Sequence, residues 1–568
     1  MMQAKRIRRL SGPRARGRPY GPYTRLAAIL LIALLIIGVR LYYYTGPVFA
    51  NTQDEMLYLS MYSGHVMSGA PVTFSQFASA NFSNFSRCEC NAANIFQFYV
   101  GLDYPEMLIL GAFGYSGSLA IYYVILTSLV EGVFIFLILE RIAGLRSAVV
   151  GGALFAFLPV DVIFSTHVQP LVPAMMAATI AVYFFIVASD TGRRLPYLAV
   201  GIFAGLAFLT NPIGAALLLF LLLALAVRAL MHMRPSRLHD PALSRRAALG
   251  IVIVCIGFFS AYLPMGIVYL AEAGKFLLYP SMLHAVYAYM DATQPSPATY
   301  CLFGGVCMEY IELAPPYYVS ILGDQPVSFM YLRYFGIAAY AFVALAAFGL
   351  VARKRNRWLA WFVILFAFYL IVIDFLPVNI VQGGGLKLYA PPEIAYVTTV
   401  FTLPLIVGSA IGLDVLFSRR RPVLVALAVI IIAAILMFDV IDLNHDVSFY
   451  RTSIVTVHEV IAYASTHPNE TVYADPTFAL AANLISGYRP TVRPLYNCSA
   501  AYVSALPGNS VIATGGMIGF DMPASTMGTF DSCIIPNLTE YTVQYNYSNP
   551  FDKYSPITEP PLVLYAKG

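Results

Sequence analysis

The sequence predicts a polytopic α-helical membrane protein that carries a C-terminal α/β domain outside the membrane. Of its 568 residues, 59% are hydrophobic and only 11% are charged, and the mean hydropathy is +0.72. A soluble domain typically carries about 25% charged residues. Apolar runs as long as a bilayer span recur along most of the chain and stop near residue 440. The first part therefore belongs in a membrane and the last part outside it.

Apolar runs of bilayer length predict about eleven transmembrane helices, some of them short or tilted. They lie near residues 26–44, 116–139, 147–164, 170–189, 195–210, 213–231, 247–270, 329–351, 357–377, 393–413 and 422–440. Together they form a membrane domain over residues 26–440. No cleavage site follows the first run, so we expect it to be retained as a helix.

Basic residues predict the orientation of the chain. The N-terminal segment 1–25 is strongly basic and directly precedes Leu26, which is typical of an orienting signal at the cytoplasmic face and not of an RNA-binding tail. We therefore expect a cytoplasmic N-terminus and no nucleic-acid partner. The inner loops are then basic, as the positive-inside rule requires; they are Arg141–Arg146, Asp190–Arg194, Arg228–Arg246, Arg353–Arg357 and Arg419–Arg421. The outer segments are 45–115, 271–328, 378–392 and 441–568.

The cysteines agree with this orientation. Six of the seven fall in outer segments, and only Cys255 lies within a span; the six are Cys88, Cys90, Cys301, Cys307, Cys498 and Cys533. An even number on the oxidising face suggests disulfides, whose pairing stays open. A metal site is the less favoured alternative, because no outer cysteine pair has a histidine at zinc-finger spacing.

The outer segment 441–568 has the alternating pattern of a small α/β domain. Ile454, Val457 and Ile461 form one apolar stripe of a helix over 453–466. A strand is predicted over 471–475, followed by a helix over 476–486 that ends at Gly487. Further strands are predicted over 510–514 and 561–566.

The first outer segment contains acidic residues at both ends. Asp54 and Glu55 follow the first span, at the membrane boundary where burial can tune a carboxylate as a proton acceptor. A solvated loop or a helix cap explains the same pair. Asp103, Tyr104 and Glu106 precede the second span, where a Tyr-Pro step is often only a helix start. Acids at both ends make a pocket plausible.

Polar residues also interrupt the apolar pattern between later spans. His167 and Gln169 lie between the third and fourth spans, with Asp161 just before them. His167 is a possible metal or phosphate ligand, although a capping or interfacial histidine is commoner. Asn211 lies in a break between the fifth and sixth spans, where a plain turn is the simpler interpretation.

A single lysine follows a Gly-rich stretch between the ninth and tenth spans. Lys387 is followed by Tyr389 on the predicted outer face, where basic residues are rare. A lipid-linked phosphate is a suitable ligand for such a lysine. A snorkelling lysine on a flexible loop is the alternative.

The order of these motifs resembles the GT-C membrane glycosyltransferases, in particular the branch of the protein O-mannosyltransferases and the aminoarabinose transferases of lipid A. The resemblance covers Asn51 to about Ala410. It rests on five features in order along the chain: the acidic pair Asp54-Glu55, the step Tyr104-Pro105, a third span that ends in Pro, the turn Thr210-Asn211-Pro212-x-Gly214, and Lys387-x-Tyr389-x-x-Pro392 before a late span.

The resemblance implies the roles of several residues. Asp54 matches the family's catalytic carboxylate, which acts as general base on an acceptor hydroxyl, and Glu55 matches its acidic neighbour. The donor is a sugar linked to polyprenyl phosphate, the acceptor is a protein, lipid or glycan, and inversion is expected. Lys387 and Tyr389 match the motif that contacts the donor phosphate. A divalent metal is possible, with Asp54 and His167 as candidate ligands.

Three residues depart from the family pattern. Leu171 stands where relatives usually have a second acid, Asn211 stands where many have lysine, and Glu106 adds an acid after the Tyr-Pro step. These departures leave metal use and donor identity open. They also keep two alternatives open, namely an inactive relative that binds glycolipid and a transporter or flippase of lipid-linked sugars. The absence of an internal repeat in the sequence disfavours transport.

Overall fold

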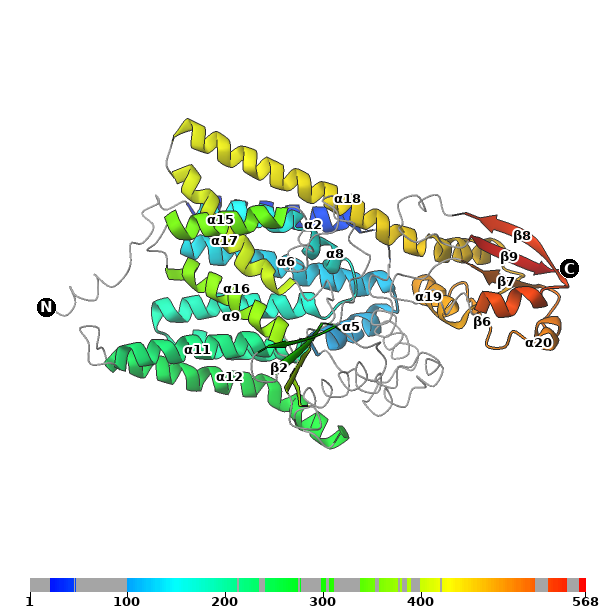
Figure 1. Ribbon diagram of the computed structural model, residues 1–568, viewed down its shortest axis with the longest axis horizontal. Helices are drawn as coiled ribbons and strands as arrows, with labels where there is room; N and C mark the ends of the chain where they lie inside the picture. Colours follow the sequence, from blue (N-terminus) through cyan, green and yellow to red (C-terminus); the bar gives the residue numbers. More distant parts are fainter. Residues whose placement is uncertain are drawn as a thin grey trace.

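The computed structural model describes residues 21–44, 46, 100–211, 214–233, 241–273, 276, 298–302, 306–310, 338–352, 357–375, 378–380, 386–389, 399–418, 421–515, 530–548 and 561–568. A bundle of apolar helices occupies one end, and a small α/β domain projects from the other (Figure 1). We call the latter the sheet domain. The side of the bundle that faces it is the sheet-domain end.

The helices of the bundle follow the predicted apolar runs. They are α2 (Pro22–Tyr43), α5 (Val100–Phe113), α6 (Gly117–Ile142), α7 (Leu145–Phe157), α8 (Pro159–Ser165), α9 (Leu171–Thr191), α10 (Arg194–Thr210), α11 (Gly214–Met233), α12 (Pro241–Ala273), α15 (Ala338–Ala352), α16 (Arg357–Phe375), α17 (Thr402–Ser418) and α18 (Pro422–Thr466). Each of the eleven predicted spans overlaps one of these helices or the pair α7 and α8. Helix α5 is additional, because it lies inside the predicted outer segment 45–115.

Length separates these helices into two groups. Within the described residues, seven helices are long and apolar enough to cross a membrane, and the bent pair α7 and α8 makes up to eight. Three further apolar helices, Arg194–Thr210, Ala341–Ala352 and Trp358–Tyr369, are shorter. The predicted spans therefore correspond to apolar helices, of which seven or eight are long enough to cross a bilayer within the described residues.

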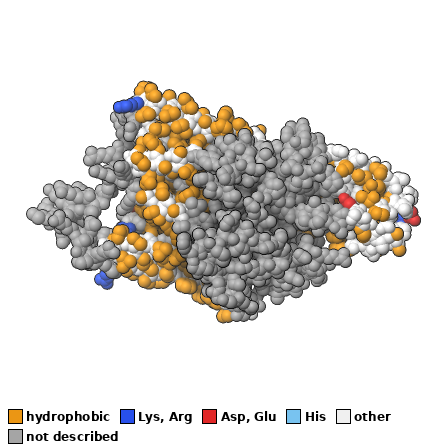
Figure 2. Space-filling model, viewed as in Figure 1, with side chains coloured by type: hydrophobic (Ala, Val, Ile, Leu, Met, Phe, Trp, Pro, Cys, Tyr) orange, Lys and Arg blue, Asp and Glu red, His pale blue; other side chains and the backbone are white. Residues whose placement is uncertain are grey.

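The outside of the bundle is apolar. Large hydrophobic side chains are exposed along α11, α12 and α18, among them Leu223, Phe259 and Ile430. Figure 2 shows this hydrophobic surface, with Lys and Arg side chains at the edge away from the sheet domain. A continuous apolar surface of this size fits a lipid environment and not water.

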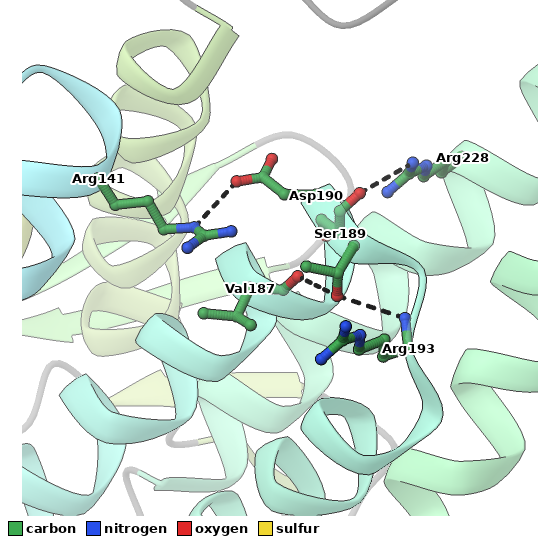
Figure 3. Close-up of polar contacts among 7 residues, drawn as sticks. Arg141, Val187, Ser189, Asp190, Arg193 and Arg228 are labelled. Carbon is green, nitrogen blue, oxygen red and sulfur yellow. Dashed lines mark hydrogen bonds and ion pairs between the residues drawn. The ribbon is translucent and has the colours of Figure 1, made fainter. Parts of the chain in front are cut away.

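Ion pairs gather at the edge away from the sheet domain, which we call the basic end. Arg25 pairs with Glu140 (2.9 Å) and Arg141 with Asp190 (3.0 Å). Arg228 donates a hydrogen bond to the Ser189 carbonyl. Figure 3 shows Arg141, Asp190, Arg193 and Arg228 around the end of α9. Described residues of three predicted inner loops, those that contain Arg141, Asp190 and Arg228, thus lie at one end of the bundle.

The third predicted span is broken. Helices α7 and α8 meet at 58°, with Leu158 in extended conformation between them and Pro159 at the first position of α8. Proline lacks the N–H that would continue the helical hydrogen bonds and is favoured at the first turn of a helix. The predicted span 147–164 is therefore made of two helices that meet at a bend.

Helix α18 joins the bundle to the sheet domain without interruption. Its 45 residues, Pro422–Thr466, combine the last predicted span with the predicted helix over 453–466. After Pro422 the segment contains neither Gly nor Pro, so the usual causes of a helix break are absent. The predicted boundary near residue 440 lies inside this helix.

The sheet domain contains a five-stranded sheet in the order β6-β5-β7-β9-β8. Its strands are β5 (Thr471–Ala474), β6 (Arg493–Pro494), β7 (Ser510–Thr514), β8 (Tyr541–Tyr547) and β9 (Leu562–Lys567), with helices α19 (Pro476–Ser486) and α20 (Ala500–Ser504). Strand β5 pairs in parallel with β6 and β7, and β9 is antiparallel to β7 and β8. The predicted α/β domain is confirmed, including the bounds of α19 and β7. The disulfide Cys498–Cys533 lies in it.

A second sheet joins two of the predicted outer segments. Its strands are β1 (Ala298–Leu302), β2 (Val306–Tyr310), β3 (Val378–Ile380) and β4 (Leu386–Tyr389), in the order β1-β2-β4-β3. Strands β1 and β2 form a hairpin in which Cys301 is opposite Cys307. Strand β4 pairs in parallel with β2, so segments 271–328 and 378–392 are neighbours in space.

Candidate active site

The structure describes only some of the site residues that the sequence predicts. Asp54 and Glu55 lie outside the described residues, so the catalytic assignment and the metal candidate Asp54 stay predictions. Lys387 and Tyr389 lie on β4, where they are register partners of Cys307 and Glu309 on β2. The remaining candidates are described with their surroundings.

Helix α5 places two acids inside the protein. Asp103 and Glu106 are fully buried, whereas Tyr104 between them is 38% exposed. Asp103 and Glu106 are three residues apart and therefore share one face of the helix, while Tyr104 faces outward. The segment predicted as a possible pocket is a helix with a buried acidic face.

A tyrosine compensates for the proline in this helix. Pro105 has no N–H to donate to the Gly101 carbonyl, four residues earlier. The Tyr123 hydroxyl on α6 donates a hydrogen bond to that carbonyl instead. This contact holds the first turns of α5 against α6.

Helix α5 also packs closely on the end of α10. A Cβ at Gly101 would overlap the Thr210 hydroxyl, which itself donates to the Leu206 carbonyl at 2.7 Å. Asn211, the half-buried residue after Thr210, caps α10 in extended conformation. The structure therefore brings the predicted turn at Asn211 next to the acidic helix.

The sheet domain contacts the connection that leads from α5 to α6. The Tyr115 hydroxyl donates to the Leu484 carbonyl on α19 at 3.1 Å. Burial, and then the nearby Tyr488 and Glu106, raise the pKa of Tyr115. Glu106 is thus close to the point where the sheet domain meets the bundle.

The connection between α8 and α9 contributes polar groups that are almost fully buried. His167 Nδ1 lies 2.5 Å from the Ile163 carbonyl; a carbonyl only accepts, so Nδ1 carries the proton and Nε2 holds the lone pair in the neutral ring. Burial lowers the pKa of His167 to about 4, so the imidazole is neutral at neutral pH. Among the described residues neither amide atom of buried Gln169 has a hydrogen-bond partner.

A complete metal site is not formed by the described side chains. Within them, no group of three or more His, Cys, Asp or Glu could hold a metal ion. Leu171, at the position of the missing acid, is buried and has no ligand atom. The neutral His167 Nε2 fits a divalent cation chemically, and any set that includes it needs ligands from outside the described residues.

Sequence reasoning missed a buried charged cluster in the bundle. Arg40 on α2, Glu131 on α6 and Asp161 on α8 are buried and interact electrostatically. The Thr402 hydroxyl donates to Asp161 at 2.7 Å, and the Thr179 hydroxyl donates to Glu131 at 3.4 Å. Charged residues inside apolar runs are the signal that could have identified all three; only Asp161 was singled out.

A second missed residue is Asp439 on α18. It is fully buried, and neither carboxylate oxygen has a hydrogen-bond partner among the described residues. A single acid in an otherwise apolar run was again the available signal.

Comparison with known proteins gives one family match. Residues 107–289 match the family model described as dolichyl-phosphate-mannose-protein mannosyltransferase. This region begins at Met107, just after Glu106, and includes the connection 166–170. Among curated proteins there is no match to this chain.

Solved structures resemble almost the whole chain. ArnT from Cupriavidus metallidurans bound to undecaprenyl phosphate is 14% identical, with a TM-score of 0.52 over 96% of this chain and 98% of that chain. The apo state of the same protein is 15% identical, with a TM-score of 0.50 over 95% and 98%. An oligosaccharyltransferase from Archaeoglobus fulgidus tethered with an acceptor peptide is 13% identical, with a TM-score of 0.49 over 96% and 74%. The predicted resemblance is therefore confirmed for the fold.

Proposed function

We propose that this chain, which has the fold of the GT-C membrane glycosyltransferases, transfers a sugar from a polyprenyl-phosphate carrier to a protein, lipid or glycan acceptor. Mannose is the first sugar to test, because the matching family model is described as a dolichyl-phosphate-mannose-protein mannosyltransferase. The structure of ArnT bound to undecaprenyl phosphate supports a carrier of this kind.

The buried acidic face of α5 carries this proposal. Asp103 and Glu106 are fully buried at the sheet-domain end of the bundle, directly before the region that matches the mannosyltransferase model. The Tyr115 contact to Leu484 is close to Glu106. A lipid-linked donor can approach from the membrane, and a polar acceptor from the side of the sheet domain.

The proposed reaction balances as follows. The acceptor hydroxyl oxygen attacks the anomeric carbon, the bond between that carbon and the phosphate oxygen breaks, and the lipid phosphate leaves. Asp54 accepts the hydroxyl proton as general base, with Glu55 as its acidic neighbour. Lys387 offsets charge on the leaving phosphate, and the anomeric configuration inverts. These roles follow from the family resemblance.

A transfer assay tests the proposal. Membranes that contain the wild-type protein are incubated with polyprenyl-phosphate mannose that carries a radiolabel on the sugar. The label should move from the carrier lipid to an acceptor molecule. Asp54→Asn should lower transfer at least about 100-fold, because a positioned general base contributes 10²–10⁴-fold. Asp190→Asn, which removes an acid paired with Arg141 at the basic end, is the matched control. Equal transfer by wild type and Asp54→Asn would contradict the catalytic role.

A flippase of lipid-linked sugars is the second candidate, because two features of the bundle favour it. The helix pair α7 and α8 is broken, and Arg40, Glu131 and Asp161 are buried charged residues; both features are typical of transporters. The test uses proteoliposomes that contain labelled lipid-linked sugar, with periodate added outside. A flippase would change the fraction of this lipid that periodate oxidises, without any transfer of sugar. A transferase would consume the lipid only when an acceptor is present.

A further inference from the structure

Arg40 makes an unusual set of contacts for a residue in a membrane helix. Its Nε donates to the Ser128 hydroxyl on α6 at 2.8 Å, and its Nη1 donates to the Ala156 carbonyl on α7 at 3.1 Å. The guanidinium carbon lies 4.9 Å from the centre of the Phe155 ring. Arg40 is fully buried, so these contacts take the place of water at Nε and Nη1, while Nη2 has no hydrogen-bond partner among the described residues.

The Ala156 carbonyl is a consequence of the broken helix. The last carbonyls of a helix have no intrahelical donor, and α7 ends at Phe157, just before Pro159. The carbonyl end of a helix also attracts a cation, most strongly where water is excluded. Arg40 therefore satisfies both the hydrogen-bonding and the electrostatic requirement of the break.

The other side of the break is fixed from a different helix. Asp161 lies in the first turn of α8 and interacts electrostatically with Arg40, and it accepts the Thr402 hydroxyl from α17. Glu131 is a second carboxyl group that interacts electrostatically with the same guanidinium. A buried acid without a cation is costly, so Arg40 stabilises both acids where they are.

We propose that Arg40 is a positioning residue that holds the break between α7 and α8 and thereby fixes the connection 166–170, with His167 and Gln169, relative to the end of α2. Asp54 follows α2 in the sequence and lies outside the described residues. The expected effect of Arg40 on catalysis rests on the proposed function. The expectation that Arg40 holds the break between α7 and α8 does not depend on that function.

Two substitutions on the same helix test the proposal in the purified full chain in nanodiscs. Arg40→Met removes the contacts to the break. Arg25→Met is the matched control, because Arg25 is also on α2 and pairs with Glu140, also on α6, but at the basic end. Hydrogen exchange of the α8 amides, such as that of Val162, which donates to the Leu158 carbonyl, reports the break directly.

The expected results separate positioning from general destabilisation. Arg40→Met should speed exchange in α8 at least about tenfold and lower kcat about 10- to 100-fold with KM for the lipid donor within about twofold, because small misplacement of site groups costs that much. Arg40→Lys should recover part of both. The double variant Arg40→Met/Asp161→Asn should be no worse than Arg40→Met, because the two residues act together. Arg25→Met should leave α8 exchange and kcat unchanged.

Three results would overturn the proposal. Unchanged exchange in α8 for Arg40→Met means that Arg40 does not hold the break, whatever happens to kcat. Faster exchange with unchanged kcat means that the break does not position the site. Equal effects of Arg25→Met and Arg40→Met mean general destabilisation. If the wild-type protein transfers no sugar, the proposed function fails, and exchange in α8 alone decides whether Arg40 holds the break.

Discussion

Side chains satisfy backbone carbonyls at two places where proline interrupts the helical hydrogen bonds. The Gly101 carbonyl, which Pro105 cannot bond, accepts the Tyr123 hydroxyl. The Ala156 carbonyl, near the break before Pro159, accepts Arg40. An unsatisfied carbonyl inside a membrane costs several kcal/mol. In both cases the donor comes from another helix, so the irregular backbone is fixed by tertiary contacts.

Tyr545 in the sheet domain gives a pH-dependent prediction. Its hydroxyl donates to Glu459 on α18 at 2.8 Å, and burial, followed by the hydrogen bond and charge of Glu459, raises the pKa of Tyr545 to about 12. The unfolded pKa is about 10. The stability that comes from the protonated hydroxyl is therefore complete below pH 10 and is lost as the pH rises toward 12.

The variant Tyr545→Phe tests whether this hydroxyl makes the protein lose stability as the pH rises from 10 to 12. The variant should be less stable at pH 8 by about 1 kcal/mol, the usual loss for one hydrogen bond, and should lose less stability than wild type between pH 10 and 12. Thermal unfolding of the purified protein in detergent across this pH range measures both. Some slope remains in the variant, because the pKa of Tyr541 is also raised to about 12. Parallel curves for the two proteins would contradict the assignment.

The sequence was informative about single polar residues but not about their partners. Asp103, Glu106, His167 and Gln169 could be selected because polar groups near span ends are conspicuous in an apolar chain. The pairing of Arg40 with Ala156 and Asp161 depends on how α2 packs against α7 and α8. No local pattern contains that information. The roles of Asp54, Glu55 and Lys387 stay predictions.

At the scale of helices and strands, the sequence predicted the elements whose ends are set by nearby residues. Helix α19 begins at Pro476 and ends before Gly487, whose φ of 63° suits glycine, and β7 is a short apolar run buried on both faces. Those two were predicted with their bounds. The break at Leu158 and the continuity of α18 were not, because a hydropathy window averages over a proline and ends where polarity rises.

Helix α5 gives a prediction at this scale. Gly101→Ala places a methyl group against the Thr210 hydroxyl, so the contact between α5 and α10 must open. We expect a loss of about 1–3 kcal/mol in unfolding free energy, as for overpacking elsewhere. Thermal unfolding in detergent measures the loss. Thr210→Ala in the Gly101→Ala background should recover part of it.

The control for this prediction is Gly38→Ala. Gly38 is inside helix α2, and a Cβ there meets nothing within 4 Å. The substitution should be neutral or stabilising, because alanine favours the helix over glycine. Equal losses at Gly38 and Gly101 would show that the cost is not due to the Thr210 contact.

For the whole molecule, two ends of different character suggest an orientation. Arg25, Arg141 and Arg228 lie at the basic end, and the disulfide Cys498–Cys533 lies in the sheet domain. Basic residues concentrate on the cytoplasmic side of membranes, and disulfides form on the oxidising side. We therefore propose that the sheet domain is extracytoplasmic and the N-terminus cytoplasmic.

Cysteine labelling in intact cells tests this orientation. Ser504→Cys places a thiol on an exposed position of the sheet domain, and Arg193→Cys places one at the basic end. A membrane-impermeant maleimide should label Ser504→Cys in intact cells above the wild-type background. Arg193→Cys should be labelled only after permeabilisation. The reverse pattern would invert the proposed topology.

The length of α18 sets both the distance of the sheet domain from the apolar part of the helix and its rotation about the helix axis. The apolar window of this helix ends at Asn444 and the helix itself at Thr466, so the last 22 residues raise the sheet domain by about 33 Å at 1.5 Å per residue. One inserted residue would lift the domain by only about 1.5 Å but rotate it by about 100°, which turns Leu484 away from Tyr115. An insertion of seven residues would restore the rotation of the domain about the helix axis to within about 20°. It would move the domain about 10 Å further along that axis.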